Sequence, residues 1–296
     1  MNVKVAVVQA TPVILNAEAS VAKACDLIGE AAAAGARLVA LPEAFVSLYP
    51  SSRWAHAAAK FTSAAAELHR QMWAAAVDAP GPLTEKLGVA TRRAKAWTAI
   101  GVSERDSNRP GTLWNTLLWF SPDGKLAHRH RKLMPTLHER VFWGQGAGDD
   151  LEPLQADFGR LGGLICWENF MPAARQRLHL GGVDFYIAPT ADDRDIWTAA
   201  MRTYAFEAGA FVLSPVQYLR KDDFPPDFPM ADELATCPDE LLVGNSLVAD
   251  PWGNVIAGPI AGREEILYAD CDLGQIIAAR RVFDVAGHYR RPEIER

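Results

Sequence analysis

The amino-acid sequence predicts an α/β protein with helices on the outer faces of mixed sheets. Short β-branched runs alternate along the chain with alanine-rich segments whose apolar residues recur at helical spacing. The connections between these segments are mostly short, which is typical of strands and helices packed in adjacent layers. A hairpin in the first half and a β-rich last third favour mixed sheets over all-parallel ones.

The first half of the chain opens with a buried strand at 3–9, followed by an amphipathic helix at 17–34 that ends near Gly35. A second apolar strand follows at 37–42. The tetrapeptide Ser121-Pro122-Asp123-Gly124 has the composition of a tight turn, and it predicts a hairpin between the strands that flank it. The other elements predicted here are a helix at 83–95 and strands at 97–103, 113–120 and 126–131.

The second half contains a segment at 221–240 that is rich in proline and aspartate. We expect it to form a long surface loop rather than a domain boundary, because strand signals resume directly after it. The sequence has no low-complexity linker and no internal repeat, so residues 1–296 are expected to form one domain. The elements predicted in this half are strands at 161–166, 184–188, 211–217, 244–249, 254–256 and 266–271, and helices at 172–180, 196–208 and 273–281.

Composition narrows the class of protein. The 296 residues carry a formal net charge of -6, with 49% hydrophobic and 22% charged residues, which argues against a nucleic-acid partner. The sequence contains no run of roughly 18 apolar residues that would span a membrane, and the N-terminus lacks a signal peptide. The four cysteines lie far apart, which indicates reduced thiols and a cytoplasmic location; they are Cys25, Cys166, Cys237 and Cys271.

Cys166 stands where an apolar strand gives way to a polar turn, with Pro172 opening the next helix. This layout places a side chain at the carboxyl end of a strand and leaves the next backbone N–H groups free to point at an oxyanion. Taken alone, a buried cysteine is more often a small core residue. The neighbouring strand ends favour a functional interpretation of Cys166.

Two other predicted strands also end in a charged residue. Glu43 follows the strand at 37–42, and a buried carboxylate is costly unless it has a partner or a function. Lys132 follows the strand at 126–131. Taken alone, Glu43 could be a helix cap or a surface acid, and Lys132 a solvated edge residue. Three strands ending in Glu, Lys and Cys together predict an active site.

The chemistry of these three side chains is complementary. A thiol needs a nearby base or positive charge to react as a thiolate at neutral pH. Glu43 can take the thiol proton and later activate water, and Lys132 can stabilise charge on the attacked group. A histidine is the more usual base for a cysteine. Among the seven histidines, His138 is the nearest candidate for that alternative.

Three motifs in this order resemble the Glu-Lys-Cys catalytic set of the nitrilase superfamily, and within it the bacterial-type nitrilase branch. They are Leu41-Pro42-Glu43, Arg131-Lys132-Leu133-Met134-Pro135-Thr136 and Cys166-Trp167-Glu168-Asn169. The segment at 138–144 is similar to the one that carries a second active-site glutamate, here Glu139. Further similar segments are 197–202, 211–214, 217–224 and 284–292. One departure is Gly244-Asn245-Ser246, where many nitrilases have Gly-Gly-Ser.

The resemblance implies a four-layer α-β-β-α sandwich, built from two mixed sheets with outer helices. It also implies a homodimer or larger homo-oligomer, with the helices at 172–180 and 196–208 as the candidate pairing surface. No metal ion and no organic cofactor is implied, because the cysteine supplies the covalent route.

The implied activity is hydrolysis of an organic nitrile to a carboxylic acid and ammonia, through a thioimidate and a thioester on Cys166. Glu139 would position Lys132 or the substrate. The candidate substrate contacts are Tyr49, His138, Trp167 and Trp197, with Trp54, Trp143 and Phe170 as further aromatic candidates that are equally ordinary core residues. The alternatives are an amidase, carbamoylase or cyanide or nitrile hydratase-type enzyme of the same superfamily, or a non-catalytic ligand-binding member.

Overall fold

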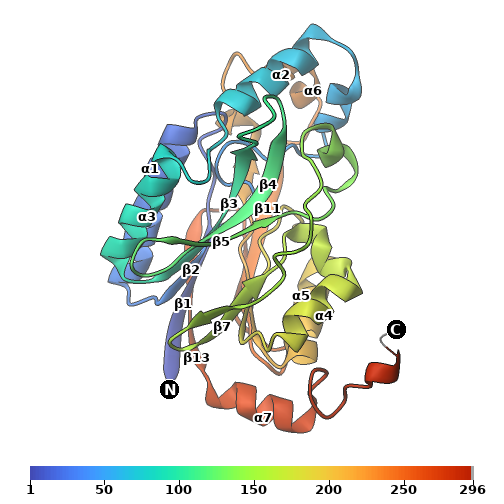
Figure 1. The fold of residues 1–296 in the computed structure, drawn as a ribbon. Coiled ribbons are helices and arrows are strands. Elements are labelled where there is room, and N and C mark those ends of the chain that lie inside the picture. Colours follow the sequence, from blue (N-terminus) through green and yellow to red (C-terminus); the bar gives the residue numbers. More distant parts are fainter. Residues whose placement is uncertain (295–296) are drawn as a thin grey trace.

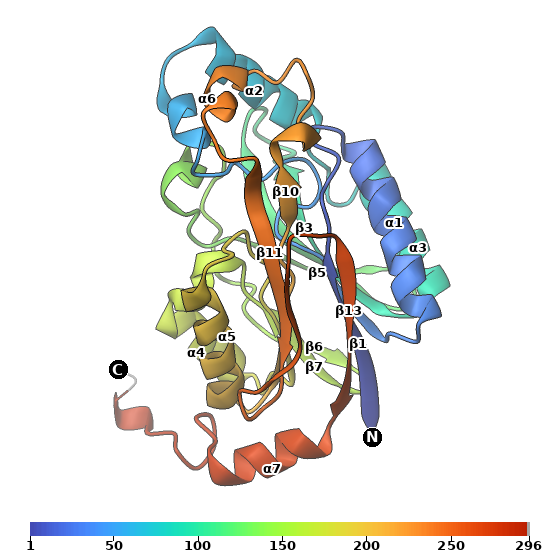
Figure 2. The ribbon, with the colours of Figure 1, turned by 180° about the vertical axis from the view of Figure 1, so that it is seen from behind.

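Two β-sheets lie face to face in the computed structural model, which describes residues 1–294, and helices cover their outer faces (Figures 1 and 2). The predicted fold class, an α-β-β-α sandwich with mixed sheets, is confirmed by this arrangement. No helix within residues 1–294 is long and apolar enough to cross a membrane.

The first sheet has the strand order β13-β1-β2-β3-β4-β5. Strand β2 pairs in parallel with β1 and β3, and the other neighbours are antiparallel. Strands β2, β3 and β5 therefore run in one direction, and their carboxyl ends meet at one edge. The strands are β1 (Asn2–Gln9), β2 (Leu38–Ala40), β3 (Trp97–Arg105), β4 (Leu113–Phe120), β5 (Leu126–Arg131) and β13 (Glu265–Asp272).

The second sheet has the order β10-β11-β9-β8-β7-β6, with β12 paired to β11. Strands β7, β8 and β9 are parallel, and the remaining pairs are antiparallel. The strands are β6 (Leu154–Ala156), β7 (Gly159–Gly163), β8 (Phe185–Ile187), β9 (Phe211–Ser214), β10 (Tyr218–Arg220), β11 (Glu240–Ala249) and β12 (Val255–Ala261).

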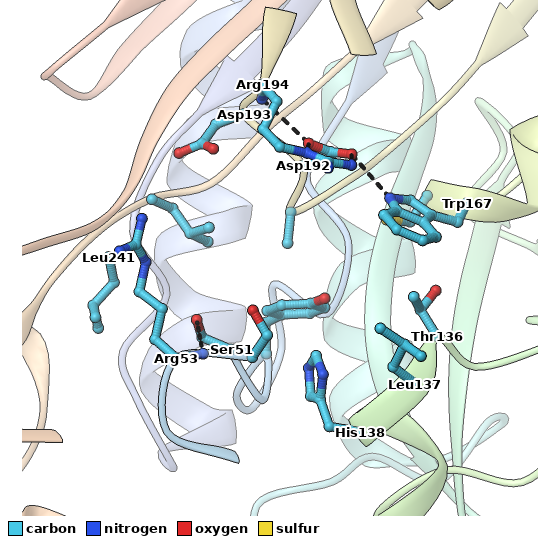
Figure 3. A pocket seen from close by; sticks show the side chains of 15 residues that line it. Ser51, Arg53, Thr136, Leu137, His138, Trp167, Asp192, Asp193, Arg194 and Leu241 are labelled. Atoms are coloured by element: carbon cyan, nitrogen blue, oxygen red, sulfur yellow. Dashed lines mark hydrogen bonds and ion pairs between the residues drawn. The ribbon is translucent and has the colours of Figure 1, made fainter. Parts of the chain in front are cut away.

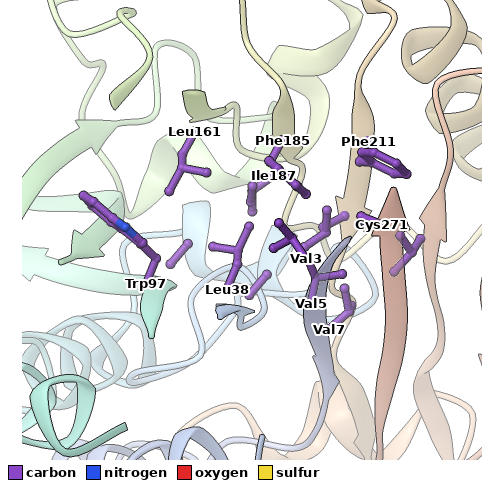
Figure 4. Packing of buried hydrophobic residues seen from close by; sticks show 14 of the residues in the cluster. Val3, Val5, Val7, Leu38, Trp97, Leu161, Phe185, Ile187, Phe211 and Cys271 are labelled. Atoms are coloured by element: carbon purple, nitrogen blue, oxygen red, sulfur yellow. The ribbon is translucent and has the colours of Figure 1, made fainter. Parts of the chain in front are cut away.

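Alternation along each strand separates an inner core from two outer ones. On β1, Val5 and Val7 point between the sheets, where they pack against the second sheet (Figure 4). Ala6 and Val8 point outward and pack against helices α1 (Ala17–Ala33) and α3 (Pro82–Ala94). The second sheet repeats the pattern, with its outer face covered by α4 (Pro172–Leu180) and α5 (Asp195–Ala208). Apolar burial on both faces thus fixes the four layers.

The segment at 221–240 is not a plain surface loop, so that expectation was wrong. It contains a short helix, α6 (Ala231–Ala235), and it buries Phe224 and Phe228 in a cluster with Trp54. The rings of Trp54 and Phe228 meet edge to face at 5.1 Å. Proline and aspartate dominate the composition of this segment, but the apolar residues between them pack against residues elsewhere in the fold. These tertiary contacts, and not the composition, determine its structure.

Most predicted boundaries are confirmed to within a few residues. Helix α2 (Ser63–Ala74) was not predicted, and α7 (Gly274–Val282) follows β13 as expected. The predicted strand at 161–166 ends earlier, at Gly163 in β7, and Cys166 instead opens a short 3-10 turn, Cys166–Phe170. The nucleophile candidate therefore lies just beyond the strand rather than in it.

Candidate active site

The structure brings together the four side chains that the sequence marked as catalytic candidates. Glu43 follows β2, Lys132 follows β5, and Glu139 lies on the 3-10 turn Leu137–Val141. All three are completely buried, and Cys166 is only 2% exposed. The first sheet thus supplies Glu43 and Lys132 from its edge, while the second sheet supplies Cys166 from the facing layer.

Lys132 joins the two glutamates. Its Nζ donates to Glu43 Oε1 at 2.7 Å and to Glu139 Oε2 at 2.7 Å. One buried ammonium is therefore shared by two buried carboxylates, which compensates the burial of all three charges only in part. The unit holds one more negative than positive charge when all three groups are ionised.

Each carboxylate is held by further donors that the sequence analysis did not identify. Asn115 Nδ2 donates to Glu43 Oε1 at 2.8 Å, and the Ala191 N–H donates to Oε2 at 3.0 Å. Asn115 is completely buried in β4. A polar residue within this largely apolar strand was the one signal in the sequence that could have indicated its role. Ala191 acts through its backbone, which no side-chain pattern reveals.

Glu139 is anchored by Tyr49, whose hydroxyl donates to Glu139 Oε1 at 2.7 Å, and by the Thr136 N–H, which donates to Oε2 at 2.8 Å. Both Glu139 oxygens are therefore occupied in addition to the contact with Lys132. These bonds fix Glu139 and through it the position of the ammonium. Tyr49, predicted as a substrate contact, also supports the catalytic cluster.

A glycine permits the close approach of the Glu43 segment to the first sheet. Gly101 lies on β3, and its N–H donates to the Pro42 carbonyl at 3.1 Å. A Cβ on Gly101 would lie 2.6 Å from Glu43 Cα, closer than side chains tolerate. The absence of a side chain at this position is what lets the backbone after β2 cross β3.

The local charges favour a protonated thiol in the resting site. Burial raises the pKa of Cys166, and the nearby Glu43 raises it further, while Lys132 opposes both. Burial also raises the pKa of Glu43, and the opposing charge of Lys132 leaves that pKa at about 7. Burial lowers the pKa of Lys132, but the two carboxylates outweigh burial and hold it well above the usual value. The arrangement provides a thiol, a base near neutrality and a permanent cation.

The turn that carries Cys166 is strained and tightly held. Cys166 has a φ of 51°, in the left-handed region that non-glycine residues rarely adopt. Its N–H donates to the Pro189 carbonyl at 2.8 Å, and Asn169 Nδ2 donates to the Cys166 carbonyl at 2.7 Å. Strain of this kind persists only where surrounding contacts over-determine it, and these bonds supply them.

Cys166 is among the residues that line a cavity of about 480 Å³, whose walls are shown in Figure 3. Three of the four predicted substrate contacts line it, namely Tyr49, His138 and Trp167. The indole N–H of Trp167 donates to Asp192 Oδ2 at 2.9 Å, and Arg194 Nε donates to Asp192 Oδ1 at 2.7 Å. These bonds fix one wall of the cavity.

His138 is unsuited to act as the base for Cys166. Its Nε2 lies 2.7 Å from the Pro50 carbonyl oxygen, so that nitrogen carries a proton and donates it there. Burial lowers the pKa of His138, which favours the neutral ring. Glu43 therefore remains the better candidate for the base, and His138 is a wall residue.

Trp197 does not lie at the cavity, and its prediction as a substrate contact needs correction. It belongs to α5 and is completely buried on the side of that helix that faces the second sheet, where its indole N–H donates to Ser214 Oγ at 2.8 Å. Helical spacing turns Trp197 toward the outer face of the second sheet. Trp54 and Trp143 are core residues too, and Phe170 packs edge to face on Trp197 at 5.8 Å.

The departure at Gly244-Asn245-Ser246 supports the cavity wall. Asn245 has a φ of 77°, a conformation that asparagine tolerates better than most residues. Its Nδ2 donates to the Asp193 carbonyl at 2.6 Å. Asp193 lines the cavity, so Asn245 contributes a contact that a glycine could not make.

Comparison with known proteins identifies the class. Residues 4–281 match the family model described as carbon-nitrogen hydrolase, so the chain belongs to the carbon–nitrogen hydrolase family and is an enzyme of that class. It is 45% identical to an aliphatic nitrilase from Sinorhizobium fredii, over 98% of this chain and 93% of the relative. It is 40% identical to the bifunctional nitrilase/nitrile hydratase NIT4A of Lupinus angustifolius, over 99% of this chain and 84% of the relative.

Solved structures support the fold independently. The chain superposes on a carbon-nitrogen hydrolase from Helicobacter pylori with a TM-score of 0.76 at 19% identity, covering 99% of this chain and 96% of the other. It superposes equally well, with a TM-score of 0.76 at 23% identity, on Nit3 of Saccharomyces cerevisiae, covering 98% and 97%. At such low identity the two structures support only the fold assignment.

Proposed function

We propose that this chain is a nitrilase that hydrolyses an organic nitrile to the carboxylic acid and ammonia. The observation that carries the proposal is the buried Glu43–Lys132–Glu139 unit, whose charges act on Cys166 in the lining of a small cavity. The similarity to proteins named as nitrilases, at 40% and 45% identity over nearly the whole chain, supports the nitrile as substrate.

The first step is attack of Cys166 Sγ on the nitrile carbon. The thiol proton passes to the Glu43 carboxylate as the carbon–sulfur bond forms. One electron pair of the carbon–nitrogen triple bond moves to nitrogen, which takes up the proton that Glu43 received. This gives the thioimidate and returns Glu43 to its carboxylate form. Lys132 stabilises the charge that develops on nitrogen, together with the backbone N–H of Trp167 in the turn after Cys166.

Hydrolysis then proceeds in two stages. Glu43 removes a proton from a water molecule, whose oxygen adds to the thioimidate carbon. Through Glu43 both protons of the water pass to nitrogen, so that ammonia leaves and a thioester remains. A second water adds in the same way, and the thiolate leaves as the acid is released. If the first tetrahedral intermediate expels the thiolate instead of ammonia, the product is the amide. The relatives named bifunctional nitrilase/nitrile hydratase make this side reaction worth measuring.

Glu139 is a positioning residue in this scheme. It contacts Lys132 at 2.7 Å and accepts the Tyr49 hydroxyl at 2.7 Å, so its role is to hold the ammonium against the reacting centre. The neutral His138 and the indole of Trp167 then form walls against which the organic group of the nitrile packs.

The assembly, domain and location predictions extend the proposal. Two copies would pair through α4 and α5, and the exposure of Ile196 at 56% and Phe206 at 43% supports an apolar contact surface there. The inner core shared by both sheets supports a single domain over residues 1–296. All four cysteines are free, which supports a reducing, cytoplasmic setting.

The test is ammonia release from phenylacetonitrile, mandelonitrile, benzonitrile, an aliphatic dinitrile and the matching amides, with the products separated by chromatography. Acid and ammonia from nitriles, with little turnover of amides, are expected. Cys166→Ala is the matched inactive control. Turnover of amides alone would replace the nitrilase by an amidase, and no turnover of either would leave only the broader carbon–nitrogen hydrolase assignment.

A further inference from the structure

A completely buried hydroxyl lies against the reacting sulfur. Thr190 follows β8, and its Oγ1 lies 3.0 Å from Cys166 Sγ. Thr190 is not among the residues that the sequence motifs or the charged cluster single out. Its position is set by the second sheet, because the Thr190 N–H donates to the Pro215 carbonyl at 3.1 Å.

The direction of the Thr190 hydroxyl proton is fixed by a second contact. The Asp192 N–H donates to Thr190 Oγ1 at 2.9 Å and so occupies one of its lone pairs. The hydroxyl proton is then free to point at Sγ, and the Thr190 oxygen acts toward sulfur as a donor. The adjacent Pro189 carbonyl accepts the Cys166 N–H at 2.8 Å, which keeps the two segments in register.

The charged groups around Cys166 are largely paired with one another, which leaves a role for a neutral hydrogen-bond donor to the sulfur. The ionisable groups that act on Cys166 are Glu43, Glu139 and Tyr49 on the acidic side and Lys132 and Arg194 on the basic side. Lys132 is shared between two carboxylates, and Arg194 is paired with Asp192. Lys132 lowers the pKa of Cys166 against burial and the two carboxylates that raise it, and the hydrogen bond from Thr190 lowers it further. Thr190 donates directly to the sulfur and is not engaged by a carboxylate.

We propose that Thr190 is a further catalytic residue, whose hydroxyl donates a hydrogen bond to Cys166 Sγ and stabilises the thiolate form of the nucleophile. The proposal rests on the proposed nucleophilic role of Cys166. When the thiol proton passes to Glu43, the sulfur pair is held by Thr190 until it forms the bond to carbon. When the thioester breaks, the pair returns to sulfur and meets the same donor. Thr190 keeps its own proton throughout.

The test is the rate of alkylation of Cys166 by iodoacetamide from neutral to alkaline pH, followed by peptide mass spectrometry. Thr190→Val removes the hydroxyl and keeps the shape, and Thr190→Ser keeps the hydroxyl. The pH midpoint of alkylation is expected to rise in Thr190→Val and to stay at the wild-type value in Thr190→Ser. The kcat/KM for a nitrile should fall about tenfold or more in Thr190→Val, as for loss of a hydrogen bond to a charged group.

Two controls separate a local effect from general damage. Thr98→Val makes the same chemical change at a buried threonine on β3, outside the site, and should leave the Cys166 profile unchanged. Cys25, which is partly exposed, reports alkylation in the same molecule. If Thr190→Val does not fold, as judged by thermal unfolding, Thr190→Ala provides the same loss of the hydroxyl.

Three results decide between the two proposals. A wild-type midpoint in Thr190→Val, or an equal rise in Thr190→Ser, overturns the role of the hydroxyl. Alkylation requires no nitrile, so a shifted midpoint in a protein that turns over no nitrile would support Thr190 and overturn the nitrilase. Nitrile turnover by the wild type, with an unshifted alkylation midpoint in Thr190→Val, would support the nitrilase and overturn the role of Thr190.

Discussion

Glu168 connects to Leu133, the residue directly after Lys132, by accepting its backbone N–H. The same carboxylate accepts the Ile165 N–H at 2.6 Å, directly before Cys166, and contacts His130 Nε2 at 3.0 Å. One buried side chain therefore joins the segment that carries the cation to the segment that carries the nucleophile. The distance between Lys132 and Cys166 depends on Glu168, although Glu168 does not line the cavity.

Replacing Glu168 by glutamine is expected to destabilise the protein and lower its turnover. The amide keeps the volume but loses the negative charge that faces His130 and one acceptor for the two backbone donors. We expect a loss of about 2 kcal/mol in the free energy of unfolding, together with a lower kcat. Urea unfolding and steady-state kinetics measure both.

Glu67→Gln is the matched control, because Glu67 makes an exposed contact with Arg70 on the surface and lies outside the site. It should change neither quantity. Full stability and full kcat in Glu168→Gln would contradict the connecting role of Glu168.

His130 should make stability depend on pH in the alkaline range. Burial lowers the pKa of His130, but the carboxylates of Glu168 and Asp150 outweigh burial and raise it to about 10. The folded pKa lies above the unfolded value of about 6.5. The stabilisation is therefore complete below about pH 6.5, decreases as the pH rises, and is lost above about pH 10.

Chemical denaturation of the wild type and of His130→Gln at a series of pH values measures this contribution. The difference between their free energies of unfolding is expected to shrink as the pH rises through that window. His69, a half-buried histidine that contacts the Gly111 carbonyl and lies outside the site, offers the same substitution, His69→Gln, as the comparison. A difference that stays constant with pH would mean that His130 is neutral in the folded protein.

Glu43 is expected to set the acid limb of the activity profile. Burial raises its pKa to about 7 despite the opposing charge of Lys132. A general base must be ionised, so kcat/KM should rise with pH through about 7. Measurement of kcat/KM against pH checks this directly.

Glu43→Gln keeps the shape of the side chain and removes the base, and it should lower kcat by about 100-fold or more. Cys25→Ser changes a cysteine outside the site and should leave the profile intact. A profile that is flat through neutrality, with Glu43→Gln active, would show that another group is the base.

The residue patterns alone predicted mixed sheets with outer helices and the charged catalytic candidates, because both depend on local patterns, whereas the four-layer sandwich came from the family resemblance. Glu43, Lys132 and Cys166 could be found since each lies at or directly after the end of a predicted strand. The second glutamate, Glu139, came only from family resemblance. The strand boundary before Cys166 was placed too late because the turn needs a positive φ that composition does not reveal.

The remaining features depend on tertiary contacts. Asn115 and Ala191 hold Glu43 from segments far away in the chain, and the Ala191 contact is made by its backbone. Thr190 ends an apolar strand as Glu43 does, but a threonine carries no charge to mark it. The buried aromatic residues of 221–240 were missed because their partners lie at the other end of the chain, near Trp54.

The two tryptophans that were both predicted to contact substrate should now behave differently. Trp197 lies in the core with its indole N–H on Ser214 Oγ, so Trp197→Phe is expected to lower the free energy of unfolding by about 1–3 kcal/mol and leave KM unchanged. Trp167 lines the cavity and is 37% exposed, so Trp167→Phe should change KM several-fold with a smaller effect on stability.

Urea unfolding and KM for the best nitrile of the panel, measured on both variants, separate the two roles. Each variant serves as the control for the other, because the chemical change is the same. A KM change in Trp197→Phe equal to that in Trp167→Phe would mean that α5 approaches the substrate after all. The opposite outcome, with KM unchanged in both, would exclude the indole of Trp167 from the substrate-binding wall and leave Tyr49 and His138 to form it.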